Sequence, residues 1–386
     1  MENENKNEIV ENKKSEKGNN KSEKKEKKGG FKFSNKAKLF TAIAALTGLS
    51  TAAVFAAKEI YDSFFPRYER PDYSVYPSCY NYETYKERLA RKTFYFHSGD
   101  VKLKGYLYEA KNSKGVIVLV HGLHAGADDY LPIAEYMVNG GYSVFSYDGT
   151  GTYDSEGDST VGMCQSLVDL DNALTYVKNT DYFQGKPLFL IGHSCGGYAV
   201  SSVLAIKKNL SIKAALCIAA VNDCFTLIID KGKEYAGELA GKGIPKIFLD
   251  TYQKILFRQY VNYNGVKGIN STDIPVIVAH GENDKIISFD GQSITAKRSE
   301  IINPNVSYYI TRGLQGGHDT LWHSERSAAY TEKVKADLKI MKEKVGRELT
   351  HEEKAEYYKT LDGALYGEVN EELFDLAIKT FDKTLN

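Results

Sequence analysis

The sequence predicts an α/β protein in which helices cover both faces of a mostly parallel central sheet. Short apolar runs recur along the chain, and the clearest, at 115–120, is continuous rather than alternating, which is typical of a strand buried on both faces. Segments with apolar residues at helical spacing lie between these runs. Strands that alternate with helices favour a parallel sheet with crossover connections. With 386 residues, 42% of them hydrophobic, the chain is long enough for one large domain with appendages.

The chain begins with a polar tail at residues 1–38. This tail holds 12 Lys and 7 Glu, a net charge of +5, whereas the remainder has 38 basic and 43 acidic residues, a net charge of −5. The tail has too little apolar surface to offset its chain entropy, so we expect it to be disordered. The slightly acidic body gives no support for nucleic-acid binding, so we expect no nucleic-acid partner.

Residues 39–57 form a run of 19 residues without a charge. As a helix this run would be about 28 Å long, roughly the hydrocarbon thickness of a bilayer. We therefore expect a membrane anchor, with the tail cytoplasmic and the folded body extracytoplasmic, since the basic residues lie on its N-terminal side. A signal peptide cleaved after small residues near Ala56, giving a secreted body, is one alternative. A soluble Ala-rich helix is another.

A Tyr-rich connector at 58–91 leads into a folded body predicted at 92–386. Two strands, at 93–97 and 101–108, are expected to pair around a Ser-Gly-Asp turn. Helices are expected near 129–139, along 167–177 and after the serine described below. Further strands are predicted at 142–147, 188–191, 214–220, 274–279 and 306–310, and those at 188–191, 214–220 and 274–279 are expected to be buried. At the C-terminal end, apolar spacing predicts two helices, and Thr350 with Glu353 forms a capping box.

The most informative stretch is Gly192-His193-Ser194-Cys195-Gly196, which joins a predicted buried strand to a predicted helix. A Gly-x-Ser-x-Gly turn in this context presents the serine hydroxyl above the edge of the sheet. Small residues at 192 and 196 let the backbone turn without a Cβ clash. The sequence therefore predicts Ser194 as a nucleophile.

A serine nucleophile needs a base and a carboxylate that orients the base, and in such sheets they follow in the order serine, acid, histidine. Asp284 comes just after the strand at 274–279, and His318 lies in the Gly-rich loop after the strand at 306–310. Both positions are at the carboxyl edge of the sheet, where ligands bind. Other candidates are Asp290 and Glu282 for the acid and His323 for the base.

Two backbone N–H groups are expected to stabilise the oxyanion. One belongs to Cys195, at the start of the helix after the serine. The other belongs to Leu123, in the loop that follows the strand at 115–120. The mechanism requires no metal or cofactor, and the spacing of the five cysteines matches no zinc site.

From about Arg91 onward the chain resembles α/β-hydrolases of the serine aminopeptidase and monoacylglycerol-lipase-like branch. The motifs that carry the resemblance are 121–123, 148–157, 192–196, 280–284 and 316–318. The resemblance implies a serine hydrolase and favours Asp284 over Glu282. The loop at 151–155 is longer than the common Gly-x-Ser form, and we expect this to change the loop rather than the catalytic residues.

The resemblance also implies a small helical cap at about 221–270, over the serine. A helix packed on the body is the alternative. The cap region has an apolar and aromatic face, which favours uncharged acyl chains, formed by Leu249, Tyr252, Leu256 and Tyr260. Its acidic residues could instead bind an amino group; these are Asp223, Asp230, Glu234, Glu238 and Asp250.

The function predicted from these features is hydrolysis of a carboxylic ester through an acyl-enzyme, with a small-molecule acyl ester or short peptide as substrate. One alternative is amide hydrolysis by an aminopeptidase-like enzyme. The other is a membrane-tethered binding protein with an inactive hydrolase body.

Overall fold

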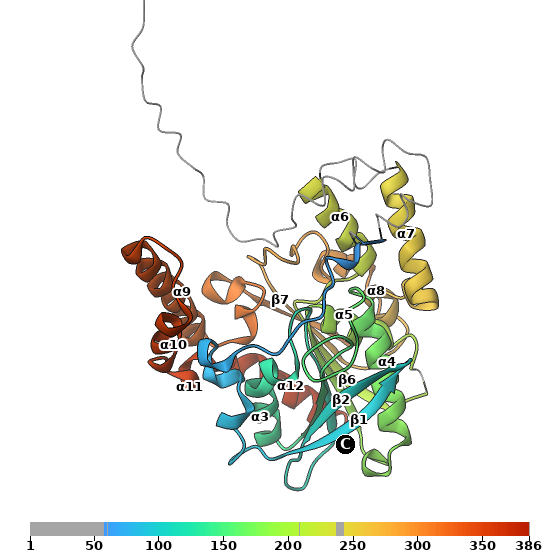
Figure 1. The fold of residues 1–386 in the computed structure, drawn as a ribbon. Coiled ribbons are helices and arrows are strands. Elements are labelled where there is room, and N and C mark those ends of the chain that lie inside the picture. The colour runs from blue at the N-terminus through green and yellow to red at the C-terminus, as the bar shows by residue number, and fades with distance from the viewer. Residues whose placement is uncertain (1–57, 60, 208, 237–242, 386) are drawn as a thin grey trace, which may run out of the picture. The chain divides into compact units, whose positions relative to one another are not determined.

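The computed structural model describes residues 58–385, apart from 60, 208 and 237–242. The tail predicted at 1–38 and the anchor predicted at 39–57 lie outside the described residues. Within the described part, eight strands form one sheet with the order β1-β2-β4-β3-β5-β6-β7-β8 (Figure 1). The strands are β1 Arg91–Ser98, β2 Val101–Tyr108, β3 Val116–Val120, β4 Ser143–Tyr147, β5 Leu188–His193, β6 Ile212–Ile218, β7 Val276–Gly281 and β8 Val306–Thr311.

The predicted α/β class with a mostly parallel sheet is confirmed. β1 and β2 form the expected hairpin, and β2 is antiparallel to β4. The strands from β4 to β8 all pair in parallel. Every residue of β3, β4, β5 and β7 is buried, as the apolar runs in β3, β5 and β7 predicted.

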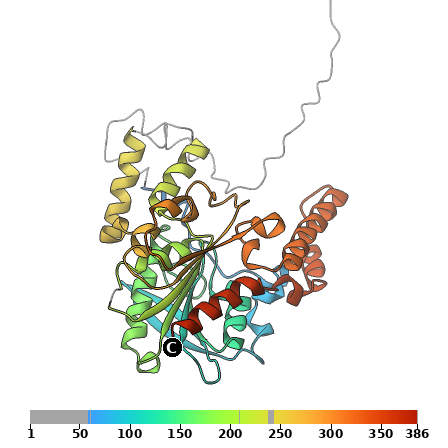
Figure 2. The same ribbon diagram turned by 180° about the vertical axis from the view of Figure 1, so that it is seen from behind.

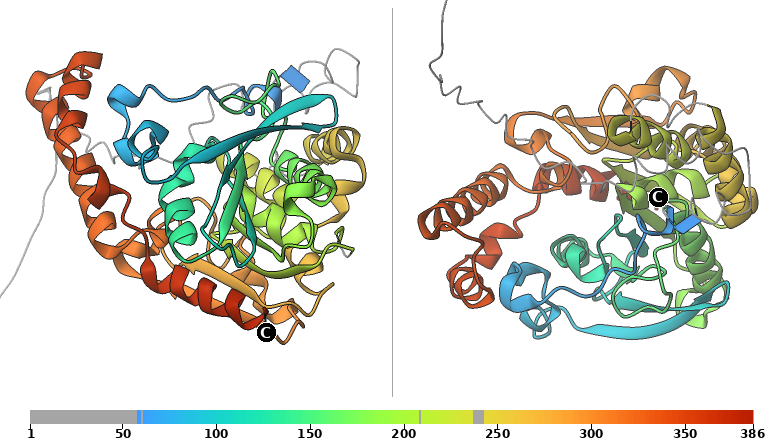
Figure 3. Two further views of the ribbon diagram at one scale, coloured as in Figure 1. Left: turned by 90° about the horizontal axis from the view of Figure 1, so that it is seen from below. Right: turned by 45° about the horizontal axis from the view of Figure 1, so that its top comes forward.

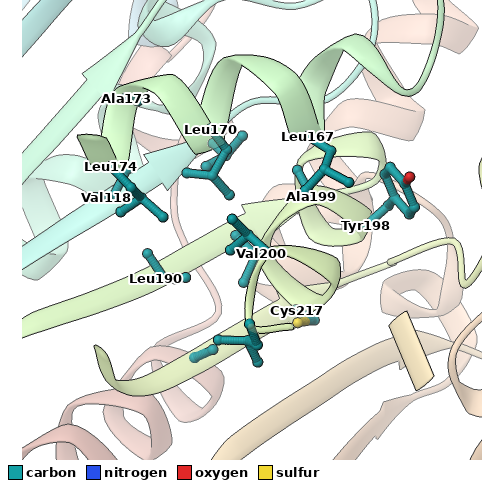
Figure 4. Packing of buried hydrophobic residues seen from close by; sticks show 14 of the residues in the cluster. Val118, Leu167, Leu170, Ala173, Leu174, Leu190, Tyr198, Ala199, Val200 and Cys217 are labelled. Carbon is teal, nitrogen blue, oxygen red and sulfur yellow. The ribbon is translucent and has the colours of Figure 1, made fainter. Parts of the chain in front are cut away.

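One face of the sheet is covered by α4 (Gln165–Asn179) and α5 (Cys195–Val203). Alternate residues of β3, such as Val118, point into this layer and pack with the apolar stripe of α4. Figure 4 shows Leu170 of α4 directed at Val200 of α5, with Leu190 of β5 beside them. This layer holds the helix that follows the serine turn firmly against the sheet.

The opposite face is covered by α3 (Leu131–Asn139) and by the C-terminal helix α12 (Glu371–Lys383), which is red in Figure 2. The other residues of β3, such as Ile117, belong to this second core. Phe381 stacks on Phe189 with ring centroids 4.6 Å apart. The last of the helices predicted at the C-terminal end thus packs on the sheet.

Along the chain, three helices lie between β8 and α12: α9 (Glu325–Val345), α10 (His351–Lys359) and α11 (Gly363–Tyr366). The capping box predicted at the start of α10 is present, with Thr350 accepting from the Glu353 amide and Glu353 accepting from the Thr350 amide. α10 and α11 contact the connector, whereas α9 contacts the short helical turns Gly313–Gly316 and Thr320–Trp322, which flank His318.

The predicted cap consists of two helices, α6 (Cys224–Ala236) and α7 (Gly243–Phe257), followed by the short α8 (Gly265–Ile269). Figure 1 shows α6 and α7 beyond the carboxyl ends of the parallel strands. Leu249 of α7 is buried, and the Tyr260 hydroxyl donates to Asp171 of α4. The cap region is therefore tied to the body at its C-terminal end.

The first part of the connector, residues 58–72, is named the strap here. It lies beside α7 at its start and then crosses the body toward α3, as the blue trace shows in Figures 1 and 3. Arg67 donates hydrogen bonds to the carbonyls of Tyr153, Ser155 and Gly157. The long loop at 151–155 is thus the surface on which the strap is held.

The expected membrane placement needs correction. Among the described residues, no helix combines the length and the apolar sequence needed to cross a bilayer. The longest, α9, has 21 residues, but charged side chains recur along it, and α7 has only 15 residues. The anchored, extracytoplasmic arrangement expected from residues 39–57 is therefore not supported.

Candidate active site

Ser194 stands at the junction of β5 and α5, between His193 and Cys195. Its backbone has φ 56° and ψ −118°, a conformation that non-glycine residues rarely adopt and that costs energy. Its N–H donates to the Ile218 carbonyl of β6, 2.8 Å away, which helps to hold this conformation. The strained turn presents the serine side chain at the carboxyl edge of the sheet.

Glycines at 192 and 196 are required by close approach of the backbone. A Cβ on Gly192 would lie 2.3 Å from the Gly196 carbonyl oxygen. A Cβ on Gly196 would lie 2.3 Å from the Val120 carbonyl oxygen, at the end of β3. The sequence-based explanation of these glycines as relief from a Cβ clash therefore holds.

Asp284 and His318 meet at the same edge of the sheet. Asp284 follows the end of β7, His318 follows β8, and His318 Nδ1 lies 2.7 Å from Asp284 Oδ2. The other carboxylate oxygen, Oδ1, accepts hydrogen bonds from the amides of Ile286 and Ile287 at 2.8 and 2.9 Å. Both oxygens are thus engaged, and the carboxylate has one fixed orientation.

Electrostatics favour an ionised acid beside a basic imidazole. Burial opposes ionisation of Asp284, but hydrogen bonds from His280 and His318 outweigh it and hold the pKa of Asp284 well below its usual value. Burial likewise lowers the pKa of His318, and the hydrogen bond and charge of Asp284 reverse this, so the net pKa is raised. Because an ionised carboxylate only accepts, Nδ1 of His318 carries the proton and Nε2 remains available.

The alternative acids and base lie elsewhere. Glu282 is paired with Arg312 at 2.7 Å on the surface, and Asp290 is exposed. His323 is buried, with its ring nitrogens near the hydroxyls of Ser327 and Tyr80. Within the described residues, the structure therefore brings Asp284, and not these acids, to His318.

His121 fixes the orientation of the peptide unit between Gly122 and Leu123, in the loop after β3. The Gly149 N–H donates to His121 Nε2, so His121 Nδ1 carries the proton and donates to the Gly122 carbonyl at 2.7 Å. In a trans peptide the Leu123 N–H points away from the Gly122 carbonyl, and therefore away from His121. A Cβ on Gly122 would lie 3.3 Å from Ser194 Cβ, so this loop passes directly against the serine.

Cys195 and Leu123 meet beside Ser194. The pKa of the Cys195 thiol is lowered by contact with the Cys224 thiol, and in smaller part by the Leu123 N–H and the Ser194 hydroxyl. The Cys195 N–H is at the first position of α5, where helical geometry provides no acceptor for it. The Leu123 N–H and the Cys195 N–H thus both belong to residues close to Ser194, and their role as oxyanion donors stays a prediction.

Three residues at the site were not given a role by the sequence. His280 Nε2 lies 3.2 Å from Asp284 Oδ2 and 3.0 Å from the Ile287 carbonyl oxygen. The Tyr130 hydroxyl accepts from the Gly122 N–H at 2.9 Å and lies 2.8 Å from His193 Nδ1. His193 Nε2 in turn lies 3.1 Å from the His318 carbonyl oxygen. The contacts of Tyr130 and His193 join the loop at 121–123 to the loop that carries His318.

In the described part of the chain, one group of residues, His193, His318 and Asp319, places three metal-ligating atoms within 4.8 Å of one another. Both ring nitrogens of His193 already have protein partners, and burial, followed by the nearby His318, lowers the pKa of His193 to about 4. The group therefore fits a hydrogen-bonded bridge better than a metal centre. All five cysteines are free and buried.

Comparison with known proteins agrees with this geometry. Residues 111–263 match the family model described as serine aminopeptidase, S33, which spans both the loop at 121–123 and the serine turn. No curated protein sequence matches. The family match confirms the resemblance drawn from the motifs and, with the strand order, the α/β-hydrolase fold; the chain is a hydrolase.

Solved structures similar to this chain include two esterases and a peptidase. The esterase of Pyrococcus furiosus is 20% identical, with a TM-score of 0.46 over 66% of this chain and 93% of that one. An esterase of Butyrivibrio proteoclasticus with bound ferulic acid is 18% identical, with a TM-score of 0.45 over 58% and 90%. The acylaminoacyl peptidase of Pyrococcus horikoshii is 17% identical, with a TM-score of 0.46 over 62% and 39%.

Proposed function

We propose that this protein is a serine hydrolase that cleaves small carboxylic esters through an acyl-enzyme. The observation that carries the proposal is the buried contact of 2.7 Å between His318 Nδ1 and Asp284 Oδ2, at the sheet edge where Ser194 occupies a strained strand-to-helix turn. A serine hydroxyl needs a base of this kind to become nucleophilic at neutral pH.

In the proposed reaction, Ser194 Oγ adds to the ester carbonyl while its proton passes to His318 Nε2. The amides of Leu123 and Cys195 bind the resulting oxyanion. The tetrahedral intermediate then collapses, the C–O bond to the alcohol breaks, and His318 returns the proton to the departing alcohol. Water attacks the acyl-enzyme by the same route and releases the carboxylic acid and Ser194.

Asp284 contributes in two ways. It holds the proton of His318 on Nδ1, so that Nε2 faces the serine, and its negative charge stabilises the imidazolium that forms in each transition state. The same interaction already raises the pKa of His318 in the free protein. His280 and the two amides that bind Asp284 keep that charge in place.

Two observations support esters of uncharged acids rather than peptides with a free amino group. Asp223, a candidate for binding an amino group, instead accepts hydrogen bonds from the amides of Phe225 and Thr226 at the start of α6. Asp230 accepts a hydrogen bond from the side chain of Gln292. In contrast, the side chain of Leu123 packs against apolar and aromatic residues of the strap and cap.

The proposal is tested with the full chain on nitrophenyl esters of graded acyl length and on aminoacyl nitroanilides, together with labelling by a fluorophosphonate. We expect ester turnover and labelling of Ser194, both lost in Ser194→Ala. Ser201→Ala is the matched control on the same helix, since its hydroxyl donates to the carbonyls of Gly197 and Tyr198.

Each other outcome contradicts the proposal in a defined way. Turnover of nitroanilides alone would make the protein an aminopeptidase-like amide hydrolase. Folded protein that neither turns over a substrate nor reacts with the fluorophosphonate would be a binding protein with an inactive hydrolase body. Full ester turnover by Ser194→Ala would place the chemistry on another residue.

A further inference from the structure

An aromatic cluster connects the strap with the cap and lies next to the proposed oxyanion loop. Tyr61 and Phe65 of the strap are buried against Phe248 and Leu249 of α7. The side chain of Leu123 packs against this strap–cap cluster, and so do Met163, Ile228 and Leu256. The strap lies outside the residues that match the hydrolase family, 111–263, so the family match assigns it no role.

The position of Leu123 relates this cluster to the reacting bond. If the Leu123 N–H binds the oxyanion, the side chain of the same residue lies next to the substrate carbonyl. An acyl chain attached to that carbonyl then meets the strap–cap cluster that Leu123 contacts. The cluster consists of aliphatic and aromatic side chains, which suit an uncharged acyl chain as neighbours.

A second series of contacts leads from the nucleophile to the same place. Cys195, next to Ser194, lies close enough to Cys224, the first residue of α6, for Cys224 to lower the pKa of the Cys195 thiol, and Cys224 belongs to the same buried core as Cys164. Both Cys164 and Cys224 lie close enough to Tyr61 to raise its pKa, although burial is the largest cause of that shift. Two series of neighbouring side chains therefore connect Ser194 with Tyr61, one through the cysteine thiols and one through Leu123.

We propose that Tyr61 is a specificity-determining residue, whose ring ends the space for the acyl chain of the substrate. The proposal rests on the ester hydrolase function proposed above and adds its substrate class, esters of short, uncharged acids. Tyr61 packs edge-on against Tyr252 of α7 and lies at the same distance, 5.0 Å between ring centroids, from Phe65. The ring is thus fixed from two sides.

Hydrogen bonds and ion pairs hold the strap in place on the body. The Phe65 carbonyl accepts from the Thr160 N–H at 3.0 Å, and Tyr68 exchanges backbone hydrogen bonds with the 151–153 segment. Arg67 adds the three carbonyl contacts described above, and Arg70 is paired with Asp128 and Asp154. With these anchors a change of side chain at Tyr61 alters the shape of the site without releasing the segment.

The hydroxyl of Tyr61 is not what holds the ring in place. Its oxygen is buried and has no hydrogen-bond partner among the described residues. A Cβ on Gly162 would lie 2.5 Å from this oxygen, so the hydroxyl faces a glycine that leaves room for it. Tyr61→Phe therefore preserves the ring and breaks no hydrogen bond, which makes it the matched control for Tyr61→Ala.

The test measures kcat/KM of the full chain on nitrophenyl esters from acetate to laurate. With Tyr61→Ala, we expect the preferred acyl chain to lengthen by two carbons or more, with a gain of about fourfold for each additional methylene that is buried. Tyr61→Phe should keep the wild-type profile. Tyr61→Leu, a milder truncation, should shift it in the same direction if Tyr61→Ala fails to fold, and a thermal melt of each variant establishes folding.

A second ester series, with the acyl group constant and the alcohol varied, separates the two sides of the scissile bond. We expect its profile to be the same in all variants. An unchanged acyl profile in a folded Tyr61→Ala or Tyr61→Leu variant would overturn the inference and leave the ester hydrolase proposal intact, and so would a shift confined to the alcohol series. Wild-type protein without ester turnover or labelling would overturn both.

Discussion

Asp284 and His318 are 34 residues apart in the chain, yet their side chains lie 2.7 Å from each other in a buried pair. β7 and β8 are neighbouring parallel strands, so the loops that follow them meet at one edge of the sheet. The second oxygen of Asp284 is bound by two backbone amides, which leaves Oδ2 for the imidazole. The pair defines both the orientation and the basicity of the proposed base.

Replacing Asp284 should remove both the orientation and the raised basicity of His318 while the protein stays folded. We expect Asp284→Asn to lower kcat by roughly 10⁴, since an amide cannot hold the same tautomer of His318 or stabilise its charge. Ester turnover measures the loss, and fluorophosphonate labelling should slow in parallel. Asp290→Asn and Glu282→Gln change the two exposed carboxylates and should retain nearly full activity; a loss in either one that matched Asp284→Asn would show that the acid is misassigned.

The pH dependence of the wild-type enzyme follows from the raised pKa of His318. The base must be neutral to accept the serine proton, so kcat/KM should fall as the pH drops through that pKa. Because the pKa is raised, the midpoint of the acid limb should lie above 6.5, the ordinary value for histidine. Asp284→Asn removes the charge that raises the pKa, so the midpoint of its residual activity should move to lower pH. A midpoint that stayed in place would argue against His318 as the titrating base.

The strands and the serine turn could be predicted from the sequence because local patterns encode them. β3, β5 and β7 are continuous apolar runs, and the glycines at 192 and 196 have a local steric reason that the structure bears out. Asp284 and His318 could be placed because parallel strands end at a common edge. The match to the family supports the fold and the hydrolase class.

Other features depend on contacts that local patterns do not encode. Tyr130 contacts His193, which is 63 residues away in the chain. The sequence around a tyrosine near the start of a helix is the same whether the side chain packs in the core or bridges two loops. The strap had only a high tyrosine content as a signal, and its Arg67 binds backbone carbonyls about 90 residues away. The membrane placement was wrong because it was inferred for the whole chain from one uncharged run.

Tyr130 offers a test of the bridge between the two loops. Tyr130→Phe removes the oxygen that accepts from the Gly122 N–H, so the peptide that carries the Leu123 amide should lose part of its alignment. We expect kcat to fall by about tenfold with little change in KM, because the oxyanion forms only in the transition state. Tyr136→Phe in α3, the helix that begins directly after Tyr130, is the control, since its hydroxyl donates to Asp375 at the surface. A rise in KM at constant kcat would instead indicate a role in ground-state binding.

Arg70 should dominate the stability of the strap. Its guanidinium is one-quarter exposed and faces two nearly inaccessible carboxylates, Asp128 and Asp148. Asp148 has a pKa raised to about 6 by burial, even with Arg70 lowering it. Arg70→Ala would leave Asp148 without its cation, while Asp128 keeps Arg91 at 2.6 Å, and we expect it to reduce the free energy of unfolding by about 3 kcal/mol at neutral pH, since unpaired buried charge is costly.

The pH dependence distinguishes this cause from a simple loss of packing. A carboxyl group whose pKa is higher in the folded than in the unfolded state stabilises the fold most when protonated, and that stabilisation is lost as the pH rises through the folded pKa. Without Arg70 the pKa of Asp148 should rise further, so the deficit of Arg70→Ala measured by urea unfolding should shrink between pH 7 and pH 5. Arg326→Ala, which breaks an ion pair with Glu368 on the surface, should cost at most about 1 kcal/mol at either pH. An Arg70→Ala deficit that is equal at both pH values would show that the loss comes from packing rather than from buried charge.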